Sequence, residues 1–263
     1  MDNPPQNHLL AALPAEEYAR LSPHLELVSL PLGCVLYEPC VRIRHAYFPT
    51  TAIVPLLHHT ENGASTEIAM IGKEGMVGIT LFMGGETTTS RAIVQSAGHA
   101  YRLNGQLLKD EFARSGQMQS LLLRYTQALL MQIAQMAVCN RHHSVGQQLS
   151  RWLLMSLDRL PSNTLTITHE LMANMLGVRR EGITEAAGKL QHAGLIHYSR
   201  GKVTVVNRSG LEACACECYR AIKKESDLLL PKVIMQPDCP DAAAPIALLR
   251  PTPPAGTLTA STR

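Results

Sequence analysis

Side chains that can hydrogen-bond to the edges of bases are concentrated between residues 179 and 185. Arg179, Arg180 and Glu181 are consecutive, and Thr184 and Glu185 follow one helical turn later. A guanidinium donates two hydrogen bonds to guanine O6 and N7, and a carboxylate accepts one from cytosine N4. The residue types and their spacing therefore predict a helix whose polar face contacts base pairs in a major groove.

Two more cations lie at a glycine turn further along the chain. Residues 195–207 place β-branched and aromatic side chains on both sides of Arg200-Gly201, a pattern typical of a β-hairpin. Arg200 and Lys202 would lie at its tip. Cations on a hairpin beside a base-contacting helix are suited to phosphate oxygens, so we expect the hairpin to be a wing.

The predicted base-contacting helix needs a second helix to hold it. Thr168 is a suitable N-cap for a first helix, and Gly177 is a suitable end. Ala173, Gly177 and Ile183 lie four and six residues apart, which is the layout of a helix-turn-helix. The second helix would bury one apolar face, formed by Ile183, Ala186, Ala187 and Leu190. Two helices with a turn also occur in ordinary protein cores, but the adjoining hairpin favours DNA contact. We expect Thr168 to be among the residues that contact DNA.

At this point the sequence resembles the winged helix-turn-helix of the Crp/Fnr family of bacterial transcription regulators. The resemblance covers residues 140–210 well and residues 20–140 more loosely. It implies a homodimer that binds a palindromic site in double-stranded DNA, with RNA polymerase as a further partner. Arg180 and Glu181 match the residue pair that contacts bases in that family. Glu185 stands where the catabolite activator has Arg, which predicts a different half-site, and Arg179 stands where Ser is frequent.

The resemblance also implies an effector-binding β-roll, for which the candidate residues are Gly78, Arg91 and Ala92. Residues 25–103 indeed show short β-rich pieces separated by turns. Cyclic-nucleotide receptors have Gly-Glu in the phosphate cassette, but Ile79 follows Gly78 here and cannot accept a ribose hydroxyl. Cyclic AMP is therefore not the expected ligand. Two alternatives remain for Arg91: it binds another anion, or it pairs with a carboxylate such as Glu74 or Glu86.

The longest periodic segment is Gln117 to Asn140, which predicts a helix that is apolar over most of its circumference. Its core seam consists of Leu122, Leu129, Ile133 and Met136, and further apolar positions widen it: Leu121, Leu123, Leu130, Met131 and Val138. An interior helix of one domain would also show this pattern. We favour a dimerisation helix, because a palindrome requires two copies of the helix-turn-helix.

Seven cysteines without a secretion-type pattern indicate free thiols rather than disulfides. Cys214, Cys216 and Cys218 invite a metal interpretation, but on one continuous helix only Cys214 and Cys218 would share a face. We therefore expect buried apolar thiols, no metal site and no cofactor. The alternative function is a haem- or metal-dependent redox sensor, whose ligands would be Cys34, Cys40 and the histidine pairs His58-His59 and His142-His143. We favour the simpler interpretation that these histidines are exposed hinge or loop residues.

The net charge of +3 is small, but its distribution is uneven. Residues 140–210 carry 9 Lys/Arg against 4 Asp/Glu, whereas residues 1–139 carry 9 against 11. The excess thus lies on the predicted DNA-binding segment. We expect an α+β fold with these parts: an arm (1–20), an antiparallel, jelly-roll-like β-roll (21–115), a long dimerisation helix and hinge (116–142), a winged helix-turn-helix (143–230), and a disordered tail with seven prolines (231–263).

The sequence contains none of the common catalytic or nucleotide-binding fingerprints, so we expect no enzyme. No stretch is apolar over the length needed to span a bilayer, and residues 1–21 lack the features of a signal peptide. We therefore expect a cytoplasmic protein without a membrane partner.

Overall fold

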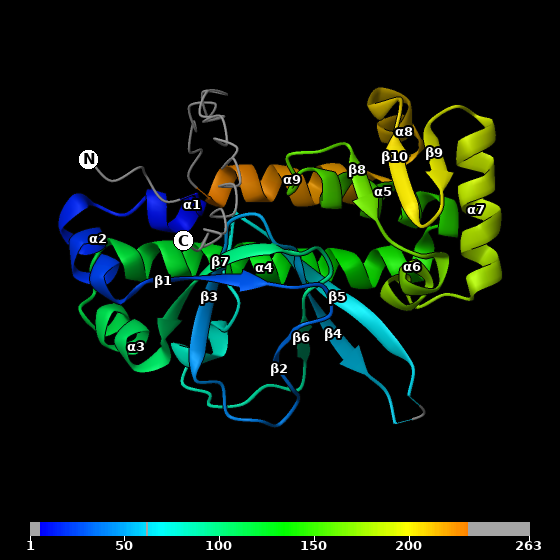
Figure 1. The fold of residues 1–263 in the computed structure, drawn as a ribbon. Helices are drawn as coiled ribbons and strands as arrows, with labels where there is room; N and C mark the ends of the chain where they lie inside the picture. Colours follow the sequence, from blue (N-terminus) through cyan, green and yellow to red (C-terminus); the bar gives the residue numbers. More distant parts are fainter. Residues whose placement is uncertain (1–5, 62, 231–263) are drawn as a thin grey trace, which may run out of the picture. The chain divides into compact units, whose positions relative to one another are not determined.

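The computed structural model describes residues 6–61 and 63–230, all of which belong to one compact unit. The predicted tail at 231–263 lies outside the described residues. Along the chain, short N-terminal helices precede a strand-rich part, a long helix and a mixed C-terminal part (Figure 1). None of the described helices combines the length and apolar composition needed to cross a membrane.

The N-terminal helices are α1 (His8–Ala11) and α2 (Ala15–Leu21), followed by the 3-10 turn η1 (Ser22–His24). Asn7 caps α1 by accepting hydrogen bonds from the amides of Leu9 and Leu10. Its amide nitrogen donates to the carbonyls of Pro49 and Gly75, at 2.9 and 2.8 Å. This fully buried side chain ties the first helix to the strand-rich part.

Within residues 6–61 and 63–230, two antiparallel sheets make up the strand-rich part. One has the order β1-β7-β3, with bounds Glu26–Leu30, Gly98–Asn104 and His45–Pro49. The other has the order β2-β6-β4-β5, with bounds Val35–Tyr37, Arg91–Ile93, Val54–His59 and Ser65–Ile71. Buried side chains such as Ala46, Phe48, Val54 and Ala92 fill the core. The predicted α+β fold with an antiparallel roll is confirmed.

Helix α3 (Gly105–Ala113) leads into the long helix α4 (Gln117–His142), as the periodicity predicts. One face of α4 is buried against the roll, where the Tyr125 hydroxyl donates to the Met76 carbonyl at 2.8 Å. The opposite face carries exposed apolar side chains: Leu123 (53%), Leu130 (56%), Met131 (43%) and Val138 (48%). We call these four residues the α4 stripe. Within the described chain nothing covers it.

The C-terminal part contains five helices and three strands among the described residues. Their bounds are α5 Val145–Leu157, β8 Thr164–Thr166, α6 His169–Leu176, α7 Arg180–His192, β9 Ile196–Ser199, β10 Lys202–Val205, α8 Arg208–Cys214 and α9 Glu217–Leu229. Helix α5 begins with a capping box between Ser144 and Gln147. Helix α9 runs alongside α4 (Figure 1).

A buried hydrogen bond links the roll to α5. The Trp152 indole nitrogen donates to Glu67 on β5 at 3.1 Å, and Trp152 and Glu67 are 0% and 1% exposed. Burial raises the pKa of Glu67 to about 7, although the Trp152 hydrogen bond and the charges of Arg151 and Arg159 act in the opposite direction. The strand-rich part and the helix-turn-helix therefore share a titratable contact.

Two local features differ from the sequence-based expectation. Strand β8 is an additional strand that pairs with β10, so the wing is a three-stranded sheet with the order β8-β10-β9. The continuous helix considered for Cys214, Cys216 and Cys218 is wrong, because extended backbone at Ala215 and Cys216 separates α8 from α9. The break exposes Cys214 and buries Cys216 and Cys218, so the thiols do not share faces as a continuous helix would place them.

Candidate nucleic-acid interface

Helix α6, which precedes the predicted recognition helix α7, is bounded by a capping threonine and a glycine. The Thr168 hydroxyl accepts a hydrogen bond from the Leu171 amide at 3.2 Å and so begins α6. Gly177 ends the helix in the left-handed region, with φ of 65°. A Cβ at this position would lie 2.6 Å from Thr66 Oγ1, so both the backbone conformation and the close approach require glycine.

Helix α7 has the two faces that its sequence predicts. Its buried face consists of Ile183, Ala186, Ala187 and Leu190, which join the core of the C-terminal part. Its exposed face carries the predicted base-contacting residues: Arg180, Glu181, Thr184 and Glu185. Arg179, at the N-cap, is exposed and makes no side-chain capping bond. The polar face of α7 is thus free for a partner.

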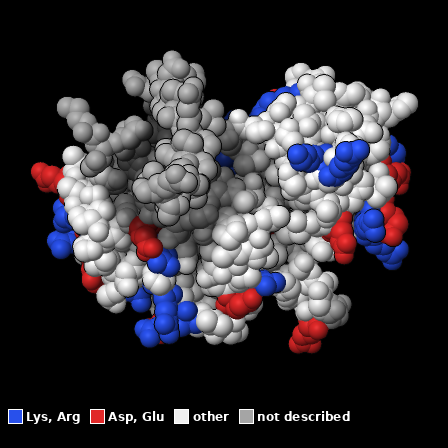
Figure 2. All heavy atoms as spheres, viewed as in Figure 1, with Lys and Arg blue, Asp and Glu red and all other residues white. Residues whose placement is uncertain are grey.

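Some charged side chains of α7 and the wing form ion pairs, and others do not. Among the described residues, Arg179, Arg180, Arg200 and Lys202 form no ion pair, whereas Glu185 pairs with Lys189 at 2.7 Å. The Lys189 hydrogen bond lowers the pKa of Glu185. Basic and acidic side chains lie together where α7 runs along the edge of the molecule (Figure 2). Four unpaired cations beside the carboxylate and hydroxyl acceptors of α7 are suited to a nucleic acid, which offers both phosphates and the edges of bases.

The wing is built by a tight turn. Ser199 and Lys202 face each other across the hairpin, and both residues between them have positive φ, 50° for Arg200 and 74° for Gly201. Positive φ at two successive turn residues matches the twist of a two-residue hairpin. The turn exposes Arg200 and Lys202, as predicted.

His169 is a residue that the sequence analysis missed. Its Nδ1 lies 3.1 Å from the Thr184 hydroxyl, and its ring stacks on Tyr198 of β9 with a centroid separation of 4.2 Å. Burial and the nearby charge of Arg180 lower the pKa of His169. His169 therefore connects the start of α6, the exposed face of α7 and the wing.

The predicted effector residues lie in the roll without forming an open anion site. Gly78 has φ of 105° and precedes the 3-10 turn η2 (Ile79–Leu81), and Ala92 is fully buried on β6. Arg91 pairs with a carboxylate, but the partner is Glu38, at 3.1 Å. The suggested partners were wrong: Glu74 pairs with Arg159 and Glu86 with Arg42. Strand pairing of β2 with β6 brings Glu38 close to Arg91.

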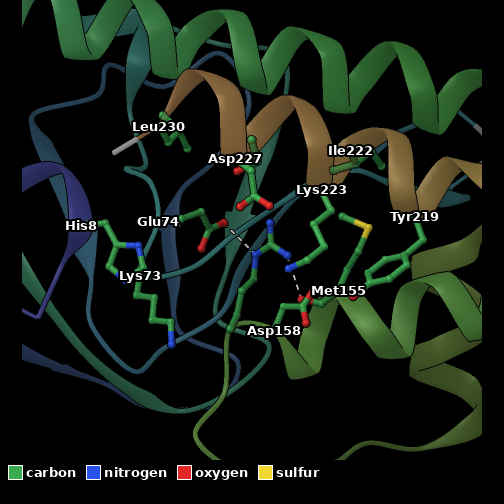
Figure 3. Close-up of a pocket in the computed structure, with 12 residues that line it drawn as sticks. His8, Lys73, Glu74, Met155, Asp158, Tyr219, Ile222, Lys223, Asp227 and Leu230 are labelled. Atoms are coloured by element: carbon green, nitrogen blue, oxygen red, sulfur yellow. Dashed lines mark hydrogen bonds and ion pairs between the residues drawn. The ribbon is translucent and has the colours of Figure 1, made fainter. Parts of the chain in front are cut away.

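A cavity of about 270 Å³ lies elsewhere, between the roll, the end of α5 and α9 (Figure 3). Gly78, Arg91 and Ala92 do not line it. Its charged lining residues carry both signs: Lys73, Glu74, Asp158, Arg159, Lys223 and Asp227. Arg159 and Glu74 pair across it at 2.7 Å, so part of this charge is already neutralised.

Of the predicted redox ligands, Cys34 and Cys40 are free thiols, one half-buried and one exposed. Neither belongs to the single group of potential metal ligands found among the described residues. Of the hinge pair, His142 is exposed as expected. His143 is not, since its side chain is only 13% exposed and faces Glu217.

Comparison with known proteins agrees with this geometry. Residues 147–214 match the family model of the Crp-like helix-turn-helix domain. No curated protein matches the chain.

Solved structures are similar over most of the chain. FixK2 from Bradyrhizobium japonicum has a TM-score of 0.62 and 14% identity, over 73% of this chain and 98% of that one. The c-di-GMP responsive global regulator CLP from Xanthomonas campestris has a TM-score of 0.57 and 18% identity, over 73% and 99%. A CRP/FNR-family transcriptional regulator from Thermus thermophilus has a TM-score of 0.56 and 24% identity, over 72% and 98%.

The fold and the matched domain together define the class of this protein. It has the fold of Crp/Fnr-type transcription regulators, and its C-terminal part contains a Crp-like helix-turn-helix domain. The resemblance predicted from residues 140–210 is confirmed.

Proposed function

We propose that this chain acts as a homodimeric, sequence-specific regulator of transcription that binds a palindromic DNA site. The observation that carries the proposal is the exposed polar face of α7, flanked by four cations that have no ion pair among the described residues. When exposed cations neutralise DNA phosphates, the counterions condensed on the DNA are released, and this release favours binding.

The individual roles follow from position. Arg180 and Glu181, in the first turn of α7, contact base edges, and Thr184 and Glu185 contact the next base pair along the groove. Phosphate contacts come from the residues around them: Thr168, Arg179, Arg200 and Lys202. Because Glu185 is held by Lys189, its carboxylate contacts a base only when it shares or leaves that pair.

A second copy of the chain covers the α4 stripe in this proposal. The stripe consists of four exposed apolar residues on one face of a 26-residue helix. A contiguous apolar face of this kind is typical of a protein–protein interface. Pairing through α4 would bring two α7 helices to one DNA duplex, as a palindrome requires.

The proposed domains keep the boundaries 21–115 for the roll, 116–142 for the dimerisation helix and hinge, and 143–230 for the DNA-binding part. RNA polymerase is the proposed further partner, because a DNA-bound regulator changes transcription either by contacting the polymerase or by blocking its access to the promoter.

The roll does not use cyclic AMP in this proposal. Ile79 offers no acceptor for a ribose hydroxyl, and Glu38 already neutralises Arg91. A regulator of similar fold is described as c-di-GMP responsive, so this fold does not fix the ligand. Isothermal titration with cyclic AMP should give no binding heat. Saturable binding that Arg91→Ala abolishes would contradict this part of the proposal.

Two variants test the DNA-binding roles. Arg180→Ala should cost roughly 1–3 kcal/mol on the cognate site, about 5- to 150-fold in affinity, and little on scrambled DNA. Lys202→Ala should weaken both DNAs alike and reduce the slope of log affinity against log salt by about 1. Fluorescence anisotropy at several salt concentrations measures both effects.

Lys224→Ala is the matched control, because it removes one exposed cation from α9 and not from the proposed interface. It should leave both affinities unchanged. Equal losses on cognate and scrambled DNA with Arg180→Ala would contradict the base-contacting role.

A further inference from the structure

Three thiols and an imidazole converge where the long helix ends. Cys139 and His143 are four residues apart at the C-terminal end of α4, and Cys216 and Cys218 flank the first residue of α9. The four potential ligand atoms all lie within 4.8 Å of one another. Cys139 Sγ lies 3.5 Å from Cys216 Sγ, and Cys218 Sγ lies 3.5 Å from His143 Nδ1.

We propose that Cys139, His143, Cys216 and Cys218 bind one zinc ion, or an equivalent thiophilic divalent cation, in a tetrahedral Cys₃His site. Zinc binds sulfur at about 2.3 Å and imidazole nitrogen at about 2.0–2.1 Å. In a tetrahedron these bond lengths place sulfur atoms about 3.8 Å apart, and sulfur and nitrogen about 3.6 Å apart. The two separations of 3.5 Å are close to those values.

The surroundings of His143 are those of a metal ligand. While Nδ1 faces Cys218, Nε2 lies 3.2 Å from a carboxylate oxygen of Glu217. Metal-bound histidines commonly donate their second ring N–H to a carboxylate, which fixes the tautomer and the ring orientation. The Gln135 amide donates to Cys218 Sγ at 3.1 Å and so restrains one of the thiols.

A buried guanidinium provides a second, independent observation. Three thiolates and one divalent cation carry a net charge of −1, which is costly to bury without a counter-charge. Arg151 is fully buried, forms no ion pair among the described residues, and leaves Nε and Nη2 without hydrogen-bond partners. It contacts Met136, one turn before Cys139, and acts electrostatically on Cys139 and on Glu67. A metal-thiolate centre would supply the missing negative charge.

The break between α8 and α9 is what allows this arrangement. Extended backbone at Ala215 and Cys216 turns Cys216 toward Cys139, and the thiols of Cys139, Cys216 and Cys218 are 0–3% exposed. Four protein ligands leave no open coordination position, so the site is structural rather than catalytic. It would fasten the hinge at the end of α4 to the closing helix α9.

Metal analysis of protein purified without chelators tests the proposal. Wild-type protein should contain one zinc ion per chain, and adding a thiol-modifying mercurial should release it to a colorimetric zinc indicator. Cobalt substitution should give the visible bands of tetrahedral Co²⁺ and a thiolate charge-transfer band. Cys216→Ser and His143→Ala should lose the metal or bind it at least about tenfold more weakly.

Matched controls come from the same segments. Cys214→Ser and His142→Ala alter exposed residues beside the ligands, and both should retain the metal at the wild-type stoichiometry. Glu217→Gln should keep one ion per chain but bind it roughly 10- to 100-fold more weakly in a chelator competition, because it only positions His143.

Three results would overturn the proposal. One is wild-type protein that takes up no zinc or cobalt when reduced and supplied with either metal. The second is a Cys139–Cys216 disulfide in the freshly isolated, metal-free protein. The third is iron with acid-labile sulfide in place of a single ion. Circular dichroism of each variant distinguishes ligand loss from failure to fold.

Discussion

Glu67 is the titratable residue in the buried hydrogen bond between the roll and α5. Its carboxyl is buried on β5, accepts a hydrogen bond from Trp152 of α5, and retains one oxygen without a partner. Its pKa rises from 4.5 to about 7, mainly because burial disfavours the charged form. A raised pKa means that the folded state binds this proton more tightly than the unfolded state.

The stability contributed by the protonated Glu67 is therefore fully present below about pH 4.5 and is lost as the pH rises through about 7. Glu67→Gln should remove this dependence, because an amide stays neutral and still accepts from Trp152. Above pH 8 the variant should be more stable than wild type by roughly 2–3 kcal/mol, and near pH 5 the two should be similar.

Urea unfolding of both proteins at pH 5 and pH 8 measures the difference. Glu61→Gln, on the exposed turn between β4 and β5, is the control and should follow wild type at both pH values. Parallel curves for wild type and Glu67→Gln would show that Glu67 does not titrate in this range.

The exposure and contacts of a residue could be predicted where its partners are close in the sequence, and not where they are distant. The exposure of Arg180 and Glu181 follows from helical periodicity, which is local. Arg91 could be identified as a candidate, but its partner Glu38 could not, because strand pairing determines that contact. The same holds for Cys139 and Cys216, whose meeting depends on how α9 packs against α4.

At the scale of elements, α4 has a buried face and an exposed one, and the exposed face predicts association. Leu130→Glu places a charge in the α4 stripe, where each chain would otherwise bury a leucine. Burial of a leucine contributes about 1.5–3 kcal/mol, and a symmetric dimer loses two. The dimer dissociation constant should rise at least about 100-fold.

Sedimentation equilibrium over a range of concentrations provides the measurement. Leu27→Glu is the control, since Leu27 on β1 is 57% exposed and Leu130 is 56% exposed. It should leave the dimer intact. A wild-type monomer at all concentrations, or a Leu130→Glu protein that dimerises like wild type, would exclude α4 as the interface.

Long elements were predictable from sequence and short ones were not. Helix α4 has enough turns for its period to be evident, and the α6–α7 pair carries both a cap and a terminating glycine. Strand β8 has three residues, and only its pairing with β10 defines it. The break at Ala215 has no glycine or proline to indicate it in the sequence. Its neighbours Cys216 and Cys218 pack in a buried cluster with Cys139, a tertiary contact that local propensity does not reveal.

At the scale of the whole molecule, the proposal requires two α7 helices that contact one face of a DNA duplex. Their half-sites should have centres about 34–36 Å apart, one helical turn of DNA. Inserting about five base pairs between the half-sites turns one of them to the opposite face. Affinity in an electrophoretic mobility assay should then fall to that of a single half-site. Unchanged affinity would contradict simultaneous binding of both half-sites.

The most direct test of the central claim is to recover genomic DNA fragments that the purified protein binds and to sequence them. We expect an enriched motif with dyad symmetry, whose half-site preference changes in Arg180→Ala and persists in Lys202→Ala. Fragments without a shared motif, or a motif without dyad symmetry, would contradict the claim that paired α7 helices recognise DNA.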